Sequence, residues 1–363
     1  MTIVYAEEYR DPAIARHLVE QIKDTRHGPV RLMEVCGTHT MAIFRHGIRA
    51  LLPDTINLLS GPGCPVCVTA QGEIDAFVEL SRRRDVILAT FGDLMRVPGS
   101  GSSLQAEKAA GADVRVVYSA MDAVDLARRE PGRQVVFLGV GFETTAPTIA
   151  AAILAARQMD LANFSVYCAH KTVPTALDAL MNNPAVKIDG FLLPGHVSVI
   201  IGLDAYKPFF QRHRTAAVVA GFEPVDILRG VLELVAMIAG GAPSLTNAYP
   251  RAVTDRGNVQ AVRVMDRVFE ACDASWRGLG TIPGSGLAIR PELAGFDAVR
   301  RYGLTASDAP EPRGCACGDI LSGTRTPPEC ALFRKLCTPM NPVGPCMVSS
   351  EGTCAAYYRY SEK

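Results

Sequence analysis

Four cysteines near the C-terminus form the pattern best suited to metal chemistry in this chain. Cys330, Cys337, Cys346 and Cys354 are separated by six, eight and seven residues, in a proline-rich segment. Four thiolates suit zinc or an iron–sulfur cluster. Zinc usually takes its sulfurs from close CxxC pairs, and the gaps here are wider. The spacing therefore favours a cubane [4Fe-4S] cluster, with ordinary buried or disulfide-bonded cysteines as the alternative.

Three further cysteines follow two predicted strands. Cys36 and His39 lie in CGTH, where a helix is expected to begin, and a helix N-terminus favours a thiolate. His39 could orient this sulfur, pair with it or share a metal with it, and such soft donors favour iron, zinc or copper. Cys64 and Cys67 form a CxxC motif that could cycle between dithiol and disulfide. The alternative for this motif is half of a zinc site, completed by Cys36 and His39.

Polar motifs also follow the later apolar runs. Glu143 lies in GFETT and His196 in PGHVS, and the motifs FGD, AHKT and GFEP occupy similar positions. Ligands of parallel sheets bind at the carboxyl ends of the strands. We therefore expect a cleft in which Glu143 and His196 act as acid–base groups or ligands. The simpler alternatives are a turn glutamate, a hydrogen-bonded core histidine, and motifs that only cap helices.

The remaining cysteines give weaker signals. Cys168 is expected in a strand and Cys272 in a helix, both as core residues. Cys315 and Cys317 form a CxC motif before the four-cysteine segment. These two residues could be auxiliary ligands or a thiol relay.

The elements that must position these residues alternate between apolar runs and amphipathic segments, which predicts parallel β-α-β units. We expect two similar α/β domains at 30–128 and 129–240. A smaller, loop-rich iron–sulfur domain is expected from residues 1–29 and 241–363, with helices at 12–26 and 257–271. The expected strands lie at 30–35, 55–59, 85–90, 113–118, 134–140, 164–169, 190–193 and 215–220.

The composition limits the possible binding partners and the cellular compartment of the protein. The 363 residues contain 37 Lys plus Arg and 37 Asp plus Glu, so no bulk charge recruits nucleic acid or an anionic membrane. The longest apolar stretch, 231–241, is too short to span a bilayer, and the N-terminus lacks the features of a signal peptide. We therefore expect a cytoplasmic protein, in which eleven cysteines indicate metal or redox chemistry.

Taken together, the motifs resemble those of the HypD family of hydrogenase maturation factors. The resemblance covers nearly the whole chain and is carried by MEVCGTHT, SGPGCPVCVT, FGDLMRVPGS, GVGFETTAPT, PGHVS, AGFEP and ECALFRKLCTPMNPVGPCMVSSEGTCAAYYRY. It departs from the family pattern only slightly, at Asp319 and Ser322. It implies two thioredoxin-like domains and a third domain with a [4Fe-4S] cluster. It also implies a scaffold, shared with HypC, on which the Fe(CN)2CO group of [NiFe] hydrogenase is assembled with cyanide from HypE.

The resemblance assigns roles motif by motif. Cys36 would hold the iron, with a second thiolate from HypC and support from His39. Cys64 and Cys67 would be the redox pair that helps supply electrons. The cluster ligands would be Cys330, Cys337, Cys346 and Cys354. This describes a redox-competent assembly scaffold rather than a conventional turnover enzyme. Two alternatives remain: a thiol–disulfide reductase acting on a protein disulfide, and a zinc-bound interaction module.

Overall fold

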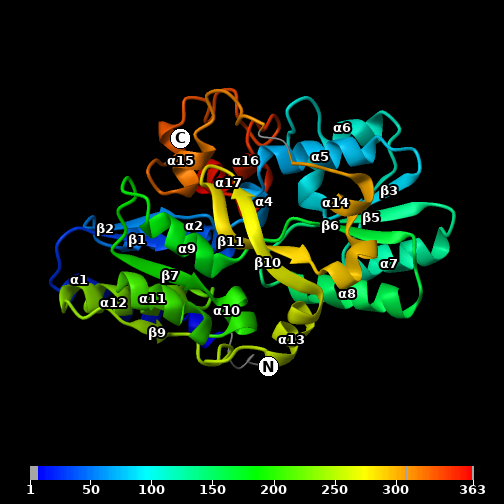
Figure 1. Ribbon diagram of the computed structural model, residues 1–363. Coiled ribbons are helices and arrows are strands. Elements are labelled where there is room, and N and C mark those ends of the chain that lie inside the picture. The colour runs from blue at the N-terminus through cyan, green and yellow to red at the C-terminus, as the bar shows by residue number, and fades with distance from the viewer. Residues whose placement is uncertain (1–6, 307–308, 362–363) are drawn as a thin grey trace.

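The computed structural model describes residues 7–306 and 309–361. Two parallel β-sheets lie side by side, each with helices packed against it, and a loop-rich, cysteine-containing region lies beside both (Figure 1). This arrangement confirms the expected α/β fold. None of the described helices is long and apolar enough to cross a membrane.

The first sheet has five parallel strands in the order β2-β1-β7-β8-β9. Their bounds are β1 (Val30–Glu34), β2 (Ile56–Ser60), β7 (Gly190–Pro194), β8 (Ala216–Ala220) and β9 (Leu245–Asn247). The second sheet has four parallel strands in the order β4-β3-β5-β6. Its strands are β3 (Val86–Thr90), β4 (Val114–Val116), β5 (Gln134–Gly139) and β6 (Phe164–Cys168).

The strand pairing does not follow the expected division at residue 128. Each sheet takes strands from both 30–128 and 129–240, because the chain leaves the first sheet after β2, builds the second sheet, and returns with β7. Strands buried on both faces read as continuous apolar runs, so their sequences carry little information about which neighbour they pair with. Residues 1–6 and 362–363 of the expected third unit lie outside the described residues.

Helices connect the strands and cover the sheets. The α-helices are α1 (Pro12–Asp24), α2 (Gly37–Arg45), α3 (Ile48–Leu51), α4 (Pro65–Val68), α5 (Gln71–Ser81), α6 (Leu104–Ala109), α7 (Ala120–Arg129), α8 (Ala146–Gln158), α9 (Val173–Met181), α10 (Gly195–Ile201), α11 (Lys207–His213), α12 (Pro224–Ala239), α13 (Val259–Val268), α14 (Ala298–Tyr302), α15 (Cys317–Leu321), α16 (Pro345–Val348) and α17 (Thr353–Tyr360). Short 3₁₀ helices are η1 (Glu8–Arg10), η2 (Gly92–Arg96), η3 (Asp204–Tyr206), η4 (Pro291–Phe296) and η5 (Pro327–Glu329).

Helix α1 packs on α12 of the first sheet, not on the cysteine-rich region as expected. Asp11 caps α1 by accepting the backbone N–H groups of Ala13 and Ile14. The buried side chains of α1 join the apolar cluster of α12 and the first sheet. The N-terminal segment therefore belongs structurally with the first sheet.

A β-hairpin replaces the end of the expected helix 257–271. Helix α13 ends at Val268 and is followed by β10 (Phe269–Trp276) and β11 (Gly280–Ile289), which pair antiparallel. Cys272 therefore lies in a strand, not in a helix. The hairpin, yellow in Figure 1, runs between the two sheets and reaches the cysteine-rich region.

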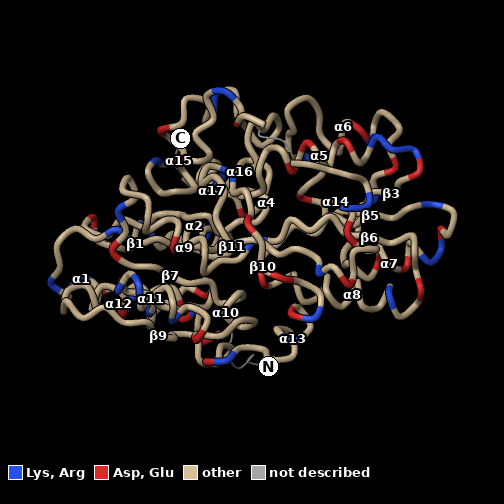
Figure 2. The backbone as a smooth tube through the Cα atoms, in the orientation of Figure 1, with Lys and Arg blue, Asp and Glu red and all other residues tan. Residues whose placement is uncertain are grey.

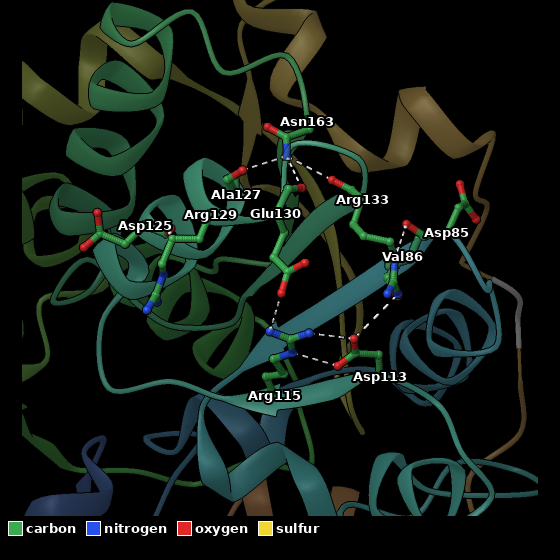
Figure 3. A network of polar contacts seen from close by, with 10 residues as sticks. All are labelled: Asp85, Val86, Asp113, Arg115, Asp125, Ala127, Arg129, Glu130, Arg133 and Asn163. Atoms are coloured by element: carbon green, nitrogen blue, oxygen red, sulfur yellow. Dashed lines mark hydrogen bonds and ion pairs between the residues drawn. The ribbon is translucent and has the colours of Figure 1, made fainter.

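Charged residues of both signs are interspersed along the loops and helices around the second sheet (Figure 2). A polar network joins the amino ends of its strands, opposite the carboxyl ends (Figure 3). Asn163 donates to the backbone carbonyls of Ala127, Glu130 and Arg133, while Arg115 forms two 2.8 Å bonds with Asp113. The network fixes the strands at the end that faces away from the polar motifs.

Candidate functional site

A cavity of about 430 Å³ lies where loops from both sheets meet. The loops that line it follow β1, β2, β5 and β7 at the carboxyl ends of these strands. They contribute Cys36, Gly63, Phe142, Thr144 and His196, and the C-terminal region adds Glu351. The structure thus places Cys36 and His196, which are 160 residues apart in the sequence, on one cavity.

Cys36 is the N-cap residue of α2 and is almost completely buried. Burial raises the pKa of its thiol to about 12, and the nearby carboxylates of Glu351 and Glu34 act in the same direction. The backbone N–H groups of His39 and Thr38 oppose this shift. Burial therefore outweighs the effect of the helix N-terminus on the pKa of this thiol.

His39 is fully buried and does not line this cavity. Its Nε2 lies 2.8 Å from the carbonyl oxygen of Gly221, and its ring packs against Phe222. Burial lowers the pKa of the imidazole to about 4, so the ring is neutral at physiological pH. His39 joins the start of α2 to the loop after β8, which suits support of Cys36 better than direct ligation.

His196 is the imidazole that faces the cavity. Its ring stacks on Phe222 with the centroids 3.9 Å apart, and partial burial lowers its pKa. Phe222 thus contacts both histidines and fixes the orientation of His196. A neutral, oriented imidazole can accept or donate a hydrogen bond to a molecule in the cavity.

Glu143 does not line the cavity, although its neighbours Phe142 and Thr144 do. Its Oε1 accepts a 2.9 Å bond from the backbone N–H of Val173, and its buried Oε2 has no hydrogen-bond partner among the residues that the structure describes. Burial raises the pKa of this carboxyl to about 7. Glu143 therefore connects the loop after β5 to α9, and its expected acid–base role remains a prediction.

The CxxC motif lies directly against Cys36. Cys64 and Cys67 form a disulfide with their Cα atoms 5.2 Å apart. The backbone N–H of Gly37 donates to the carbonyl of Gly63 at 3.0 Å. A Cβ on Gly63 would lie 2.1 Å from the backbone nitrogen of Cys36, so only glycine permits this approach. The two motifs form one continuous site.

Six cysteines converge in the C-terminal region. The four predicted ligands, Cys330, Cys337, Cys346 and Cys354, are all buried and line one small cavity, together with Cys315 and Cys317. The sulfurs of Cys317 and Cys346 are 2.9 Å apart. Helix α16, which carries Cys346, packs against α4, which carries Cys67. The thiol-rich cavity therefore adjoins the disulfide, which in turn adjoins Cys36.

Within the described ranges 7–306 and 309–361, no three His, Cys, Asp or Glu side chains are arranged to hold a metal ion. In a cubane cluster each thiolate binds a different iron atom, so its ligands need not converge on one ion. Six thiols around one cavity, five buried and that of Cys315 half-buried, provide the donor type that such a cluster requires. The residues present thus fit an iron–sulfur cluster.

Two residues of this region are not predicted by the sequence motifs. Glu351 lines the Cys36 cavity and accepts a 2.6 Å bond from Thr38. No acidic residue lies between Glu329 and Glu351 in the sequence. A single carboxylate in this cysteine-rich segment is a feature from which Glu351 could have been predicted. Arg277 is fully buried beside the CxxC motif. Its sequence context gives no comparable signal.

Fold and site together define a two-sheet α/β protein with a cysteine cavity, an adjacent CxxC disulfide and a cysteine-rich C-terminal region. Residues 13–361 match the family described as "HypD: Hydrogenase formation hypA family". The chain is 46% identical over 368 residues to the hydrogenase maturation factor HypD of Rhodobacter capsulatus, covering 98% of each chain. It is 44% identical to HypD of Escherichia coli K12, covering 99% of this chain and 98% of that one. The chain belongs to the HypD family of hydrogenase maturation factors.

Proposed function

We propose that this protein and HypC form the scaffold on which the Fe(CN)2CO group is assembled, with cyanide delivered by HypE. The observation that carries the proposal is the position of Cys36, in a cavity shared by loops of both sheets, with the Cys64–Cys67 disulfide beside it. Iron that carries cyanide and carbon monoxide prefers soft thiolate donors. Cys36 would bind this iron as the substrate, and a thiolate of HypC would bind it from the open side.

Cyanide delivery needs electrons if the carrier is a thiocyanate, R–S–C≡N. Release of CN⁻ breaks the S–C bond, and the carrier sulfur must then gain two electrons and a proton. Reduced Cys64 and Cys67 can supply both. The carrier becomes R–SH, the two cysteines form a disulfide, and one proton is released with CN⁻. In this proposal the Cys64–Cys67 disulfide would be the product of the step.

A [4Fe-4S] cluster in the thiol-rich cavity would supply one-electron redox chemistry when bound. The sequence assigns its ligands to Cys330, Cys337, Cys346 and Cys354. The close contact of Cys346 with Cys317 favours a different set, in which these two residues form a second dithiol. The cluster ligands would then be Cys315, Cys330, Cys337 and Cys354, which line the same cavity.

Infrared spectroscopy of the protein, purified anaerobically with HypC after expression with the full maturation set, tests the scaffold role. We expect bands from metal-bound cyanide and carbon monoxide in the wild type. Cys36→Ala should lose these bands and keep the iron and acid-labile sulfide of the cluster. Unchanged bands in Cys36→Ala would contradict the assignment of Cys36.

Single serine variants distinguish the two ligand sets. Cys315→Ser should lose acid-labile sulfide, whereas Cys346→Ser and Cys317→Ser should retain it. The half-buried Cys272 lies in the hairpin, and Cys272→Ser is the matched control. Loss of sulfide in Cys346→Ser, with retention in Cys315→Ser, would restore the ligand set assigned from the sequence.

The CxxC disulfide also favours a second candidate, a thiol–disulfide reductase acting on a protein disulfide. Both cysteines are buried, at 4% and 0% exposed, so a disulfide of another protein has little access to them. The same burial limits access of a protein-borne thiocyanate, so burial alone does not separate the two roles. Turnover of a protein disulfide that depends on Cys64 and Cys67 would support the reductase instead.

Metal analysis tests the remaining alternative, a zinc-bound interaction module. Zinc in the purified protein without acid-labile sulfide would indicate this module.

A further inference from the structure

Arg277 lies in the turn between β10 and β11, and its side chain has no exposure to solvent. A buried guanidinium is costly unless its N–H groups find acceptors. Here Nε donates to the carbonyl of Thr69 at 3.0 Å and Nη2 donates to Gln71 Oε1 at 3.1 Å. Nη1 pairs with Glu311, whose side chain is 39% exposed. The arginine is therefore held by specific partners inside the protein.

These partners place Arg277 against the segment that follows the CxxC motif. Besides the side-chain bonds to Thr69 and Gln71, the backbone N–H of Arg277 donates to the carbonyl of Val68 at 2.8 Å. Val68 directly follows Cys67. One residue thus fixes the chain on the C-terminal side of the disulfide.

The next residue in the turn meets the cysteine-rich region. A Cβ on Gly278 would lie 2.1 Å from the Cα of Gly318, and a Cβ on Gly318 would lie 2.7 Å from the Cα of Gly278. The backbones of the turn and of α15 are therefore in direct contact. Gly318 directly follows Cys317. Arg277 consequently lies between the segment of Cys67 and the segment of Cys317.

We propose that Arg277 is a positioning residue that holds the CxxC disulfide next to the thiol-rich cavity and places a permanent positive charge between them. The proposal rests on the proposed function, because it gives this charge a role in redox chemistry. An electron that enters the thiol-rich region adds negative charge, and a buried cation stabilises that charge strongly in a medium of low dielectric constant. Glu311 offsets only part of this effect, because it is partly exposed and screened by solvent.

The test compares Arg277→Met, which removes the charge, with Arg277→Lys, which keeps it. The readout is the midpoint potential of the cluster, followed by its visible absorption in a redox titration at fixed pH, together with iron and sulfide content. We expect Arg277→Met to lower the equilibrium constant for one-electron reduction of the cluster about tenfold. This change equals a fall of about 59 mV in the midpoint potential. Arg277→Lys should stay close to the wild type.

Arg290 provides the matched control, because it is a half-exposed arginine at the other end of the hairpin, bonded to the carbonyl of Asp266. Arg290→Met should leave the midpoint unchanged. If Arg277→Met does not fold, Glu311→Gln keeps the arginine and removes its counter-charge, and it should raise the midpoint. A loaded cluster with the wild-type midpoint in Arg277→Met or Glu311→Gln would overturn the role of Arg277. A wild type without iron and sulfide would overturn the proposed function and this inference with it.

Discussion

At residue scale, the backbones of Gly63 and Cys36 approach each other closely beside the cavity. The two loops that meet there carry the predicted iron ligand and the predicted redox pair. Their separation is set by backbone contact, which leaves no room for a side chain. The chemistry of the site thus depends on a residue that has no functional group.

We expect Gly63→Ala to lower the free energy of unfolding by about 2–3 kcal/mol, because the new methyl group overlaps the backbone of Cys36. Denaturant unfolding of the anaerobic protein measures this loss. The control is Gly132→Ala, where a Cβ has no atom within 4 Å. Equal stability of the two variants would show that the loops separate without cost.

Because Glu143 is buried, we expect the free energy of unfolding to depend on pH. Its folded pKa of about 7 lies above the usual value of 4.5 for a glutamate because the carboxyl is buried. The folded state therefore binds the proton more tightly, and this contribution to stability is lost as pH rises from about 4.5 to 7. Glu143→Gln removes the dependence.

The stability of Glu143→Gln relative to the wild type should thus rise across this pH range, by at most roughly 3 kcal/mol. Denaturant unfolding at a series of pH values from 5 to 8 provides the measurement. Exposed Glu79 serves as the control, through Glu79→Gln. A pH-independent difference between Glu143→Gln and the wild type would contradict the prediction.

At the scale of elements, α1 shows how one helix is assigned to a sheet. It is joined to the first sheet by a single buried face packed on α12, and its opposite face meets solvent. Ile22 lies on the buried face with no exposure, whereas Ile14 is 39% exposed. The two isoleucines form a matched pair on one helix.

Ile22→Ala should cost about 2–5 kcal/mol, because it removes buried methyl groups and leaves a cavity. Ile14→Ala should change stability by less than about 0.5 kcal/mol. Thermal or denaturant unfolding distinguishes these outcomes. Similar small effects of both substitutions would mean that α1 does not pack on the first sheet in solution.

At the scale of the whole molecule, the two sheets are interleaved along the chain. The fragment 30–128 contains β1 and β2 without β7, and it contains β3 and β4 without β5. Each sheet would lose its inner strand pairings and expose apolar faces. The two sheets therefore depend on one continuous chain.

We expect the separate fragments 30–128 and 129–240 to lack cooperative unfolding transitions, whereas the full chain shows one. Circular dichroism during denaturant titration provides the measurement, and mixing the two fragments tests whether they complement each other. A cooperative transition in fragment 30–128 alone would support the contiguous domains expected from the sequence.

The sequence by itself determined most of the local secondary structure and identified the candidate metal-binding and redox residues. Apolar runs and helical periodicity located the eight strands of 30–220, because each signal lies within one element. The predicted strands end at residue 220, so β9 and the β10–β11 hairpin were not predicted. At the α13–β10 junction a short helix passes directly into a strand, which hides the boundary between them. Cys36, the CxxC motif and the C-terminal cysteines were evident from residue type and spacing.

Tertiary structure alone decided what depends on distant contacts. Strand order came from pairing between β1 and β7, which are about 160 residues apart. The raised pKa of Cys36, the contact of Cys317 with Cys346 and the position of Arg277 all follow from burial against remote segments. Residue types set what chemistry is available, whereas burial and proximity set which group carries it out, and those properties exist only after the chain has folded.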